Sequence, residues 1–198
     1  SLPAGGIKSG FAFLDPLNGW ITGSEPVNDF VYLYRTTDGG TTWAHQPCDI
    51  ADADPDAMYN SFPPIFVSET EGFLPLQTFL MDGTALTILC KTTDGGQTWQ
   101  SVSSAPIQAY VFDFVDGQNG WILGETALFR STDGATTWED LSSSLPAGYT
   151  ALSLDFVDEQ AGWLLVYDSS SDSLDHNLLF YSQNGGQTWV QLDARMGD

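Results

Sequence analysis

The sequence predicts an all-β protein, a β-propeller built from four-stranded antiparallel blades, and three observations lead to this prediction. An eight-residue pattern recurs four times along the 198 residues. A single aromatic residue and a glycine-aromatic pair precede every copy at a constant spacing. The segments between these patterns are short apolar runs without helical periodicity. Four short strands in a unit of about 40 to 55 residues are typical of a propeller blade.

The eight-residue pattern starts at Ser or Thr and ends at Trp, with five residues from its Asp to its Trp. The copies are 36–43, 92–99, 131–138 and 182–189. Glycine reaches positive φ without strain, so the Asp-Gly-Gly step predicts a tight turn between the third and fourth strands. The predicted structural residues of the four turns are Asp38, Trp43, Asp94, Trp99, Asp133, Trp138, Asn184 and Trp189.

The second pattern marks the first two strands of each blade. Its aromatic residues are Phe13, Phe66, Phe114 and Phe156, followed after seven residues by Trp20, Phe73, Trp121 and Trp163, each preceded by Gly. All seven tryptophans of the chain lie in the two patterns, so we expect tryptophan to be architectural. The blades are predicted at about 6–48, 62–104, 108–142 and 150–193, within a single propeller domain or partial propeller over 1–198.

The octets resemble the Asp-box, or bacterial neuraminidase repeat, Ser/Thr-x-Asp-x-Gly-x-Thr-Trp. A glycine-tryptophan strand and a basic residue just ahead of the box, at Arg35, Lys91 and Arg130, make the chain most similar to propellers of the photosystem II stability and assembly factor type. The resemblance covers the whole chain and implies a propeller. It implies less about function, because sialidases, xyloglucan-cleaving hydrolases and sortilin-like receptors share this scaffold element.

A repeated pentapeptide indicates that the array of blades continues. Residues 1–5, Ser-Leu-Pro-Ala-Gly, recur at 144–148, and the same offset superimposes Phe13 on Phe156. The second occurrence is the link that leaves a fourth strand, so the first is expected to follow a blade outside this sequence. Further blades, or self-association with a second copy, would then close the ring. A closed ring of four blades is the alternative.

Two kinds of connection vary in length between blades, and in a propeller they emerge on one face. They are the second-to-third strand connections and the links between blades, at 23–30, 44–63, 76–84 and 167–177. Variable connections on one face usually mark a binding surface. The candidate binding residues in these loops are Asp52, Asp54, Asp56, Tyr59, Asp172, Asp175 and His176.

The net charge of the chain narrows the classes of partner that it can bind. With 26 acidic and 5 basic residues the formal net charge is −21, which excludes a nucleic-acid footprint and favours a protein or surface polymer with a basic patch. The most apolar stretch, 73–90, is interrupted by polar residues and predicts no membrane span. The aspartates at 52, 54 and 56 lack the Gly and Glu of a calcium loop, and His176 has no second His nearby. We therefore predict no metal and no cofactor.

Catalysis is the competing hypothesis. Asp113 and Asp155 hold equivalent inner-strand positions, and glycoside hydrolysis needs two carboxylates about 5 to 9.5 Å apart. The first two blades have Ala12 and Ile65 there, and no arginine cluster for an anionic sugar is evident. The favoured function is a non-catalytic, extracytoplasmic scaffold that binds protein, with export inferred from the resemblance and the Lys-poor composition. The alternative is a polysaccharide-active hydrolase, or a fragment of one, using the two aspartates.

The two cysteines leave one question open. Cys90 occupies the slot that Tyr34, Phe129 and Phe180 fill in other blades, so it is expected to be a buried core residue. Pairing with Cys48 is an alternative to two separate thiols. Two cysteines do not identify a redox compartment.

Overall fold

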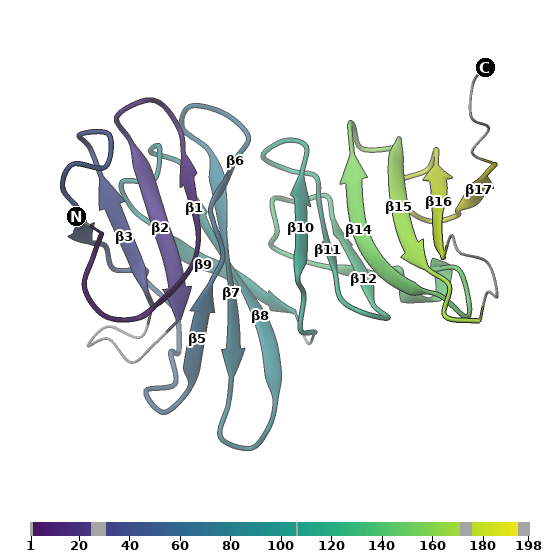
Figure 1. The fold of residues 1–198 in the computed structure, drawn as a ribbon, viewed down its shortest axis with the longest axis horizontal. Coiled ribbons are helices and arrows are strands. Elements are labelled where there is room, and N and C mark those ends of the chain that lie inside the picture. The colour runs from purple at the N-terminus through teal and green to yellow at the C-terminus, as the bar shows by residue number, and fades with distance from the viewer. Residues whose placement is uncertain (1, 25–30, 106, 171–175, 194–198) are drawn as a thin grey trace. The chain divides into compact units, whose positions relative to one another are not determined.

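The structure, a computed structural model, describes residues 2–24, 31–105, 107–170 and 176–193. It divides into two compact units, Ser1–Gln108 (unit 1) and Ala109–Asp198 (unit 2). Its elements are strands, apart from one 3-10 helix, η1, at Ser142–Ser144 (Figure 1). No helix among the described residues is long and apolar enough to cross a membrane. The all-β prediction is confirmed.

Unit 1 contains the first two blades, which share one nine-stranded antiparallel sheet. The first blade contributes β1 (Ile7–Phe13), β2 (Gly19–Ser24), β3 (Leu33–Thr36) and β4 (Ala44–His45). The second contributes β5 (Met58–Ser61), β6 (Ile65–Phe66), β7 (Gly72–Phe79), β8 (Ala85–Thr92) and β9 (Gln100–Ala105). The sheet is continuous because β5 pairs with β7 along its length and with β2 at one position.

Strand β5 differs from the expectation that 44–63 is a connecting loop. Pro63 and Pro64 follow it, and proline cannot donate a ladder hydrogen bond. The strand that precedes β7 is therefore split into β5 and β6, both paired with β7. The extra strand joins the two blades of unit 1.

Unit 2 contains two separate four-stranded blades, each with its strands paired in chain order, as predicted. The first blade is β10 (Val111–Phe114), β11 (Gly120–Leu123), β12 (Leu128–Ser131) and β13 (Glu139–Asp140). The second is β14 (Thr150–Phe156), β15 (Gly162–Tyr167), β16 (Asn177–Ser182) and β17 (Val190–Leu192).

The seven-residue spacing of the aromatic pattern follows from the strand register. Each first-strand Phe pairs directly with the Gly that precedes the second-strand aromatic, as in Phe156 with Gly162. The phenyl ring covers that glycine: a Cβ added to Gly162 would lie 2.3 Å from a ring carbon of Phe156, and one added to Gly120 2.2 Å from Phe114. Only glycine leaves room for the ring, so the pair must be Phe and Gly together.

The Asp-box is a self-contained hydrogen-bonded turn, and Asp133 shows the pattern. Its Oδ1 accepts hydrogen bonds from Ser131 Oγ (2.9 Å), Thr136 N (3.0 Å) and Thr137 N (2.9 Å), and its Oδ2 accepts one from Thr137 Oγ1 (2.6 Å). The Thr137 hydroxyl, with these other donors, lowers the pKa of Asp133 to about 2. Both oxygens of the Asp133 carboxylate are thus engaged in hydrogen bonds within the turn.

Asn184 preserves most of this turn in the last copy. Its Oδ1 accepts hydrogen bonds from Ser182 Oγ (3.0 Å) and Thr188 N (2.9 Å), while its Nδ2 donates to Thr188 Oγ1 (2.9 Å). The threonine hydroxyl therefore reverses its role from donor to acceptor. An amide is a working substitute for the carboxylate.

The second-strand tryptophans connect neighbouring blades within each unit. Trp121 stacks on Phe156 of the next blade with ring centroids 3.7 Å apart, and its Nε1 donates to Gly185 O (2.9 Å). Trp20 packs on Phe66 at 4.9 Å, and its Nε1 donates to Gln46 Oε1 (2.8 Å). Both tryptophans are fully buried. The expected architectural role of these residues is visible as an aromatic joint between blades.

The basic residue ahead of each of the first three boxes lies over the ring of the second-strand aromatic. Arg35, Lys91 and Arg130 pair across the strands with Trp20, Phe73 and Trp121, and their charged groups lie 5.6, 5.2 and 5.3 Å from the ring centroids. Tyr181 takes the same position over Trp163, at 4.9 Å between centroids. Cation-π contacts of this kind stabilise by about 0.5–1 kcal/mol at exposed sites.

Substitution of Asp133 tests the box turn. D133A removes every acceptor and should lower the free energy of unfolding of unit 2 by about 1–2 kcal/mol after screening by water. D133N should cost less, because Asn184 shows that an amide fits. Chemical denaturation followed by tryptophan fluorescence measures both.

The pH dependence supplies a second check on the same pair of variants. The lowered pKa of Asp133 means that the ionised carboxylate stabilises the folded state above about pH 4, and that this contribution is lost as the pH falls towards about 2. The difference between wild type and D133N should shrink over that range. Equal stability of D133A and D133N at neutral pH would contradict this account of the turn.

Candidate functional site

A groove of about 440 Å³ lies in unit 1 between the link from β4 to β5 and strands β7 to β9. We call it the acidic-loop groove. Its lining residues come from the link, from β5, from the β7–β8 hairpin and from β9: Ile50, Ala51, Asp52, Ala53, Asp54, Tyr59, Thr78, Leu80, Leu86, Ile88, Ser101, Val102, Ser103 and Ser104. Three residues predicted from the variable loops, Asp52, Asp54 and Tyr59, therefore meet at one groove.

Backbone hydrogen bonds fix the start of the acidic loop against β9. Asp49 N donates to Trp99 O (2.9 Å), and Ser101 N donates to Asp49 O (2.8 Å). Ala51 N then donates to the hydroxyl of Ser101 (2.9 Å). Asp52 follows with φ of 55°, a left-handed conformation that Asp tolerates better than most residues. The loop is held at one end while its first acidic side chain stays exposed.

Tyr59 holds the other end of the loop. It was expected to be a loop residue of the binding face, but it lies in β5 with only 5% of its surface exposed. Its hydroxyl accepts a hydrogen bond from Asp54 N (3.1 Å), and Asp54 Oδ1 accepts one from Asp56 N (2.9 Å). Burial raises the pKa of Tyr59, which keeps the phenol neutral. Asp52 and Asp56 remain exposed and Asp54 is half-buried.

The groove combines one acidic wall with an apolar floor. Leu80, Leu86 and Ile88 are half-buried and face the acidic link across the groove, while β9 contributes serines. Mostly apolar sites with a few placed polar groups are typical of binding grooves. This arrangement suits a segment that carries both cationic and apolar side chains.

Sequence reasoning missed the part of the groove's lining that β8 and β9 contribute. The parallel bridge between Asp49 and Gln100 joins residues far apart in the chain, and no local periodicity encodes such a contact. The only local signal was the variable length of the connections. It pointed to the acidic loop and to the β7–β8 hairpin, but not to β9.

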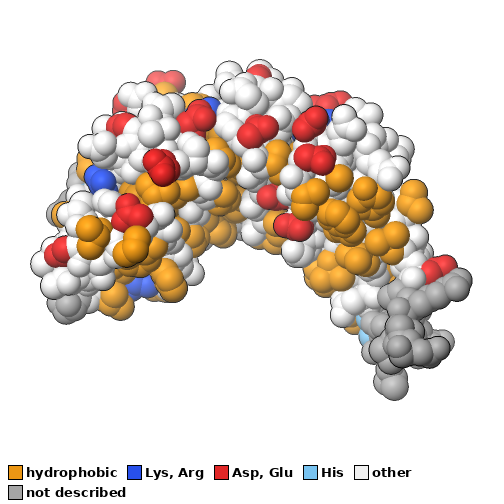
Figure 2. All heavy atoms as spheres, turned by 90° about the horizontal axis from the view of Figure 1, so that it is seen from above, with side chains coloured by type: hydrophobic (Ala, Val, Ile, Leu, Met, Phe, Trp, Pro, Cys, Tyr) orange, Lys and Arg blue, Asp and Glu red, His pale blue; other side chains and the backbone are white. Residues whose placement is uncertain are grey.

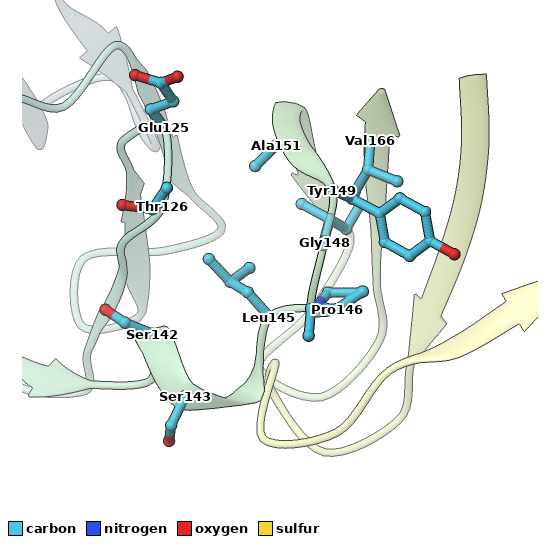
Figure 3. Close-up of a pocket in the computed structure, with 12 residues that line it drawn as sticks. Glu125, Thr126, Ser142, Ser143, Leu145, Pro146, Gly148, Tyr149, Ala151 and Val166 are labelled. Atoms are coloured by element: carbon cyan, nitrogen blue, oxygen red, sulfur yellow. The ribbon is translucent and has the colours of Figure 1, made fainter. Parts of the chain in front are cut away.

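A second pocket, of about 320 Å³, lies in unit 2 at the link between its two blades. Figure 3 shows Glu125 and Thr126 on one side and Tyr149 and Val166 on the other, with Leu145 between them. The link that leaves a fourth strand thus borders a pocket in each unit. Only one carboxylate, that of Glu125, lines this second pocket, so it lacks the acidic wall of the first.

Asp56 and His176 are not among the residues that line the acidic-loop groove. Asp172 and Asp175 are outside the described residues. His176 lies at the base of the β15–β16 hairpin, with Nδ1 3.0 Å from Asp168 O and its ring beside Tyr167. In the described part of the chain, no group of three or more His, Cys, Asp or Glu side chains is placed to hold a metal ion. The absence of a metal or cofactor stays a prediction for the whole chain.

The side chain of Asp113 connects the two blades of unit 2. Its Oδ2 accepts a hydrogen bond from Phe156 N in the neighbouring strand β14. Burial, together with the nearby Asp155 carboxylate, raises the pKa of Asp113 to about 6, against the opposing effect of that hydrogen bond. Asp155 is exposed. The two aspartates are therefore electrostatic neighbours, but Asp113 is already engaged by backbone.

Acidic side chains dominate the charged surface. Figure 2 shows them on both units, with few lysines and arginines among them. Of the basic residues, Arg35, Lys91 and Arg130 are held over the aromatic joints.

Comparison with protein families finds a match to the Sortilin-Vps10 family model, described as sortilin, neurotensin receptor 3, over residues 88–198. Among solved structures, the chain is similar to one described as YCF48 bound to D1 peptide, with a TM-score of 0.52 and 18% identity over 96% of this chain and 83% of that one. It is also similar to the Hadza microbial sialidase Hz136, with a TM-score of 0.51 and 19% identity over 86% of this chain and 36% of the sialidase. A comparison with curated protein sequences found no match. At these identities, the two structures show a shared propeller fold.

Substitution of Asp113 tests its role between the blades. The raised pKa means that the protonated form favours the fold, so the contribution of Asp113 to stability is present below about pH 4 and is lost as the pH rises through about 6. In D113N the amide oxygen still accepts from Phe156 N, and this loss should disappear. Thermal unfolding from pH 3.5 to 7.5 should show wild type falling relative to D113N.

Asp155 provides the matched control for this titration. D155N removes the like charge beside Asp113, so the pH midpoint of the wild-type loss should move to a lower value. Parallel stability curves for wild type and D113N across the whole range would refute the assignment.

Proposed function

Because the chain belongs to the Sortilin-Vps10 family, whose model matches more than half of it, we propose that it is a non-catalytic propeller scaffold that binds another protein through the acidic-loop groove. The observation that carries the proposal is the groove itself, where carboxylates and apolar side chains meet at one concave surface. The proposed ligand is an extended polypeptide segment with Lys or Arg side chains for Asp52 and Asp54 and an apolar side chain for the floor.

The net negative charge of the chain favours a basic partner both before contact and within the groove. The formal net charge of −21 attracts a basic segment before contact, which raises association rates most at low ionic strength. Within the groove, an ammonium or guanidinium group can replace water at the half-buried Asp54 carboxylate. The apolar floor then supplies burial, which is the larger and less salt-dependent contribution.

The structural neighbours are compatible with this function. YCF48 is described with a bound D1 peptide, so a protein with this fold takes a peptide ligand. The family description names a receptor. We extend the proposal to an extracytoplasmic location, supported by that description and by a composition with only five basic residues.

A polysaccharide-active hydrolase remains the alternative function. The observation in its favour is the Asp113 carboxyl, whose pKa of about 6 is suited to a general acid and which has Asp155 beside it. Against it stands the hydrogen bond from Phe156 N, which ties Asp113 to the neighbouring blade. Release of reducing sugar from a polysaccharide panel, abolished by both D113N and D155N, would favour the hydrolase over the scaffold.

A second proposed interaction is with another Asp-box blade. Phe156 is 4% exposed because Trp121 covers it, whereas Phe13 in the equivalent slot is 44% exposed. Phe13 and Phe11, which is 71% exposed, line an apolar pocket of about 430 Å³ on β1. We propose that this face receives the fourth blade of a second copy, where Trp163 is the second-strand aromatic.

Neutralising the acidic loop tests the proposed groove. D52N/D54N/D56N keeps the side-chain shapes and the Asp54 hydrogen bond but removes three charges. The affinity for extended peptides with alternating Lys and Leu should fall about 3- to 30-fold at low salt, and the difference should shrink at high salt. Fluorescence anisotropy with labelled peptides measures it, and the melting temperature should hardly change.

Three exposed carboxylates elsewhere provide the control. E69Q/E139Q/D193N makes the same change in net charge outside the acidic-loop groove. It should leave most of the peptide affinity in place. If both triple variants weaken binding equally, only the overall charge attracts the peptide, and the groove has no special role.

Replacement of Phe11 tests the blade-binding face. Phe11→Ser removes an exposed apolar side chain, so it should abolish self-association seen by sedimentation velocity while leaving the melting temperature of the protein nearly unchanged. Met81→Ser, at a residue 83% exposed in the β7–β8 hairpin and outside both the Phe11 pocket and the fourth blade, is the matched control and should associate as wild type does. A wild-type protein that stays monomeric at all concentrations would exclude a second copy as the partner of this face.

A further inference from the structure

We propose that Cys48 and Cys90 form a disulfide that staples the two blades of unit 1 and anchors the acidic loop. Cys48 Sγ lies 2.8 Å from Cys90 Sγ in the reduced pair that the structure shows. Neither residue was assigned a role by the proposed function, and the inference rests on geometry that is independent of it.

Contacts on both sides of Cys48 hold it against β8. On the N-terminal side, Gln46 Nε2 donates to Gly96 O (2.8 Å) and Gln97 O (2.9 Å) in the next blade's Asp-box turn. On the C-terminal side, Asp49 forms its two backbone hydrogen bonds with Trp99 and Ser101. Cys48 is thus fixed between two anchored neighbours, with its Sγ 2.8 Å from that of Cys90.

Cys90 is equally constrained. It lies in β8, fully buried, paired with Leu74 on one side and with Ser101 on the other. The β8–β9 register shifts between Leu89 and Cys90, at the level where the acidic link meets β9. Since the same Ser101 also binds Asp49 and Ala51, the cysteine pair and the loop share one anchor.

The exposure of the two thiols sets the order of reaction. Cys48 is half-buried and accessible to a small disulfide, whereas Cys90 is shielded from solvent. The neighbouring Cys48 thiol and burial raise the pKa of the Cys90 thiol, so Cys90 is a poor first nucleophile. Cys48 reacts first, and Cys90 resolves the intermediate.

The reaction is thiol-disulfide exchange with a small dialkyl disulfide such as glutathione disulfide. The deprotonated Cys48 Sγ attacks one sulfur of the oxidant, forming a mixed disulfide and expelling one thiolate. Cys90 Sγ, losing its proton, then attacks Cys48 Sγ and expels the second thiolate. The protein loses two protons and two electrons, and one glutathione disulfide becomes two glutathione thiols.

The consequence is a covalent link between blades across a separation of 42 residues. Closing a loop of this length restricts the unfolded chain and should raise the melting temperature of unit 1 by about 5–15 °C. It also fixes Cys48, two residues before Ile50, where the lining of the groove begins. The N-terminal end of the acidic wall is therefore held covalently in the oxidised protein.

The test equilibrates the whole, folded protein with glutathione disulfide and then alkylates the remaining thiols. The expected result is loss of both alkylation sites, a peptide map with Cys48 joined to Cys90, and a melting temperature that falls on addition of reductant. The variants Cys48→Ser and Cys90→Ser should each melt at one temperature with or without reductant, which separates the bond from any effect of the substitution on folding.

Three outcomes would overturn the inference. The first is that both cysteines stay open to alkylation after oxidation and denaturation. The second is that glutathione remains attached at Cys48 without release. The third is that the bond forms between two molecules, seen as a dimer on a non-reducing gel. Peptide binding by the acidic-loop groove is measured separately, so its failure would leave the disulfide result intact.

Discussion

The aromatic joint between blades is the interaction on which the rest of the structure depends. In unit 2, Trp121 lies flat on Phe156 and donates a hydrogen bond to the Asp-box of the next blade. Phe156 can reach that position only because Gly162 leaves space for its ring. The contact of Arg130 with the ring of Trp121 follows from the same geometry, because the two residues are paired across β11 and β12. A single blade could not bury these surfaces alone, so each blade depends on its neighbour.

The Asp-box complements the joint because its acidic side chain is satisfied within the turn. The Asp133 carboxylate accepts four hydrogen bonds within a single turn, and the backbone carbonyl of Gly185 in another box remains available to Trp121. One end of each blade is therefore fixed by local chemistry. The connections at other positions carry no such requirement, and their length and charge are free to change without loss of the fold.

The repeat made the fold predictable, because its residues act through short-range contacts. The Phe-Gly pairs, the box turns and the basic residue over three of the four second-strand aromatics are all set by contacts within one blade. Strand β5 was not predictable in this way. Its partners are β7 and a single residue of β2, and Pro63 and Pro64 obscure the alternation that would have marked a strand. Tyr59 was consequently taken for a loop residue although its ring is buried.

The candidate site was predictable only in part for the same reason. Local sequence revealed the acidic residues of the link, but not that Asp49 would run beside Gln100 or that Cys48 would meet Cys90. These contacts depend on Gln46, which replaces the direct bond seen at Trp121 with a bridge from Trp20 to the carbonyls of Gly96 and Gln97.

That bridge explains why unit 1 holds the acidic groove. The amide of Gln46 is buried and bonded on both sides, so it pulls the link that leaves β4 onto the next blade's box turn. Beyond Gln46 the chain passes Cys90 at Cys48. Asp49 then forms backbone hydrogen bonds with Trp99 and Ser101, ahead of Asp52. In unit 2, the corresponding link forms η1, Ser144 Oγ donates a hydrogen bond to Gly186 O in the next blade's box, and Trp121 reaches the same box directly. Both links therefore reach the next blade's box, and the link of unit 1 differs because it then bonds to β9 and places Asp52 and Asp54 along the groove.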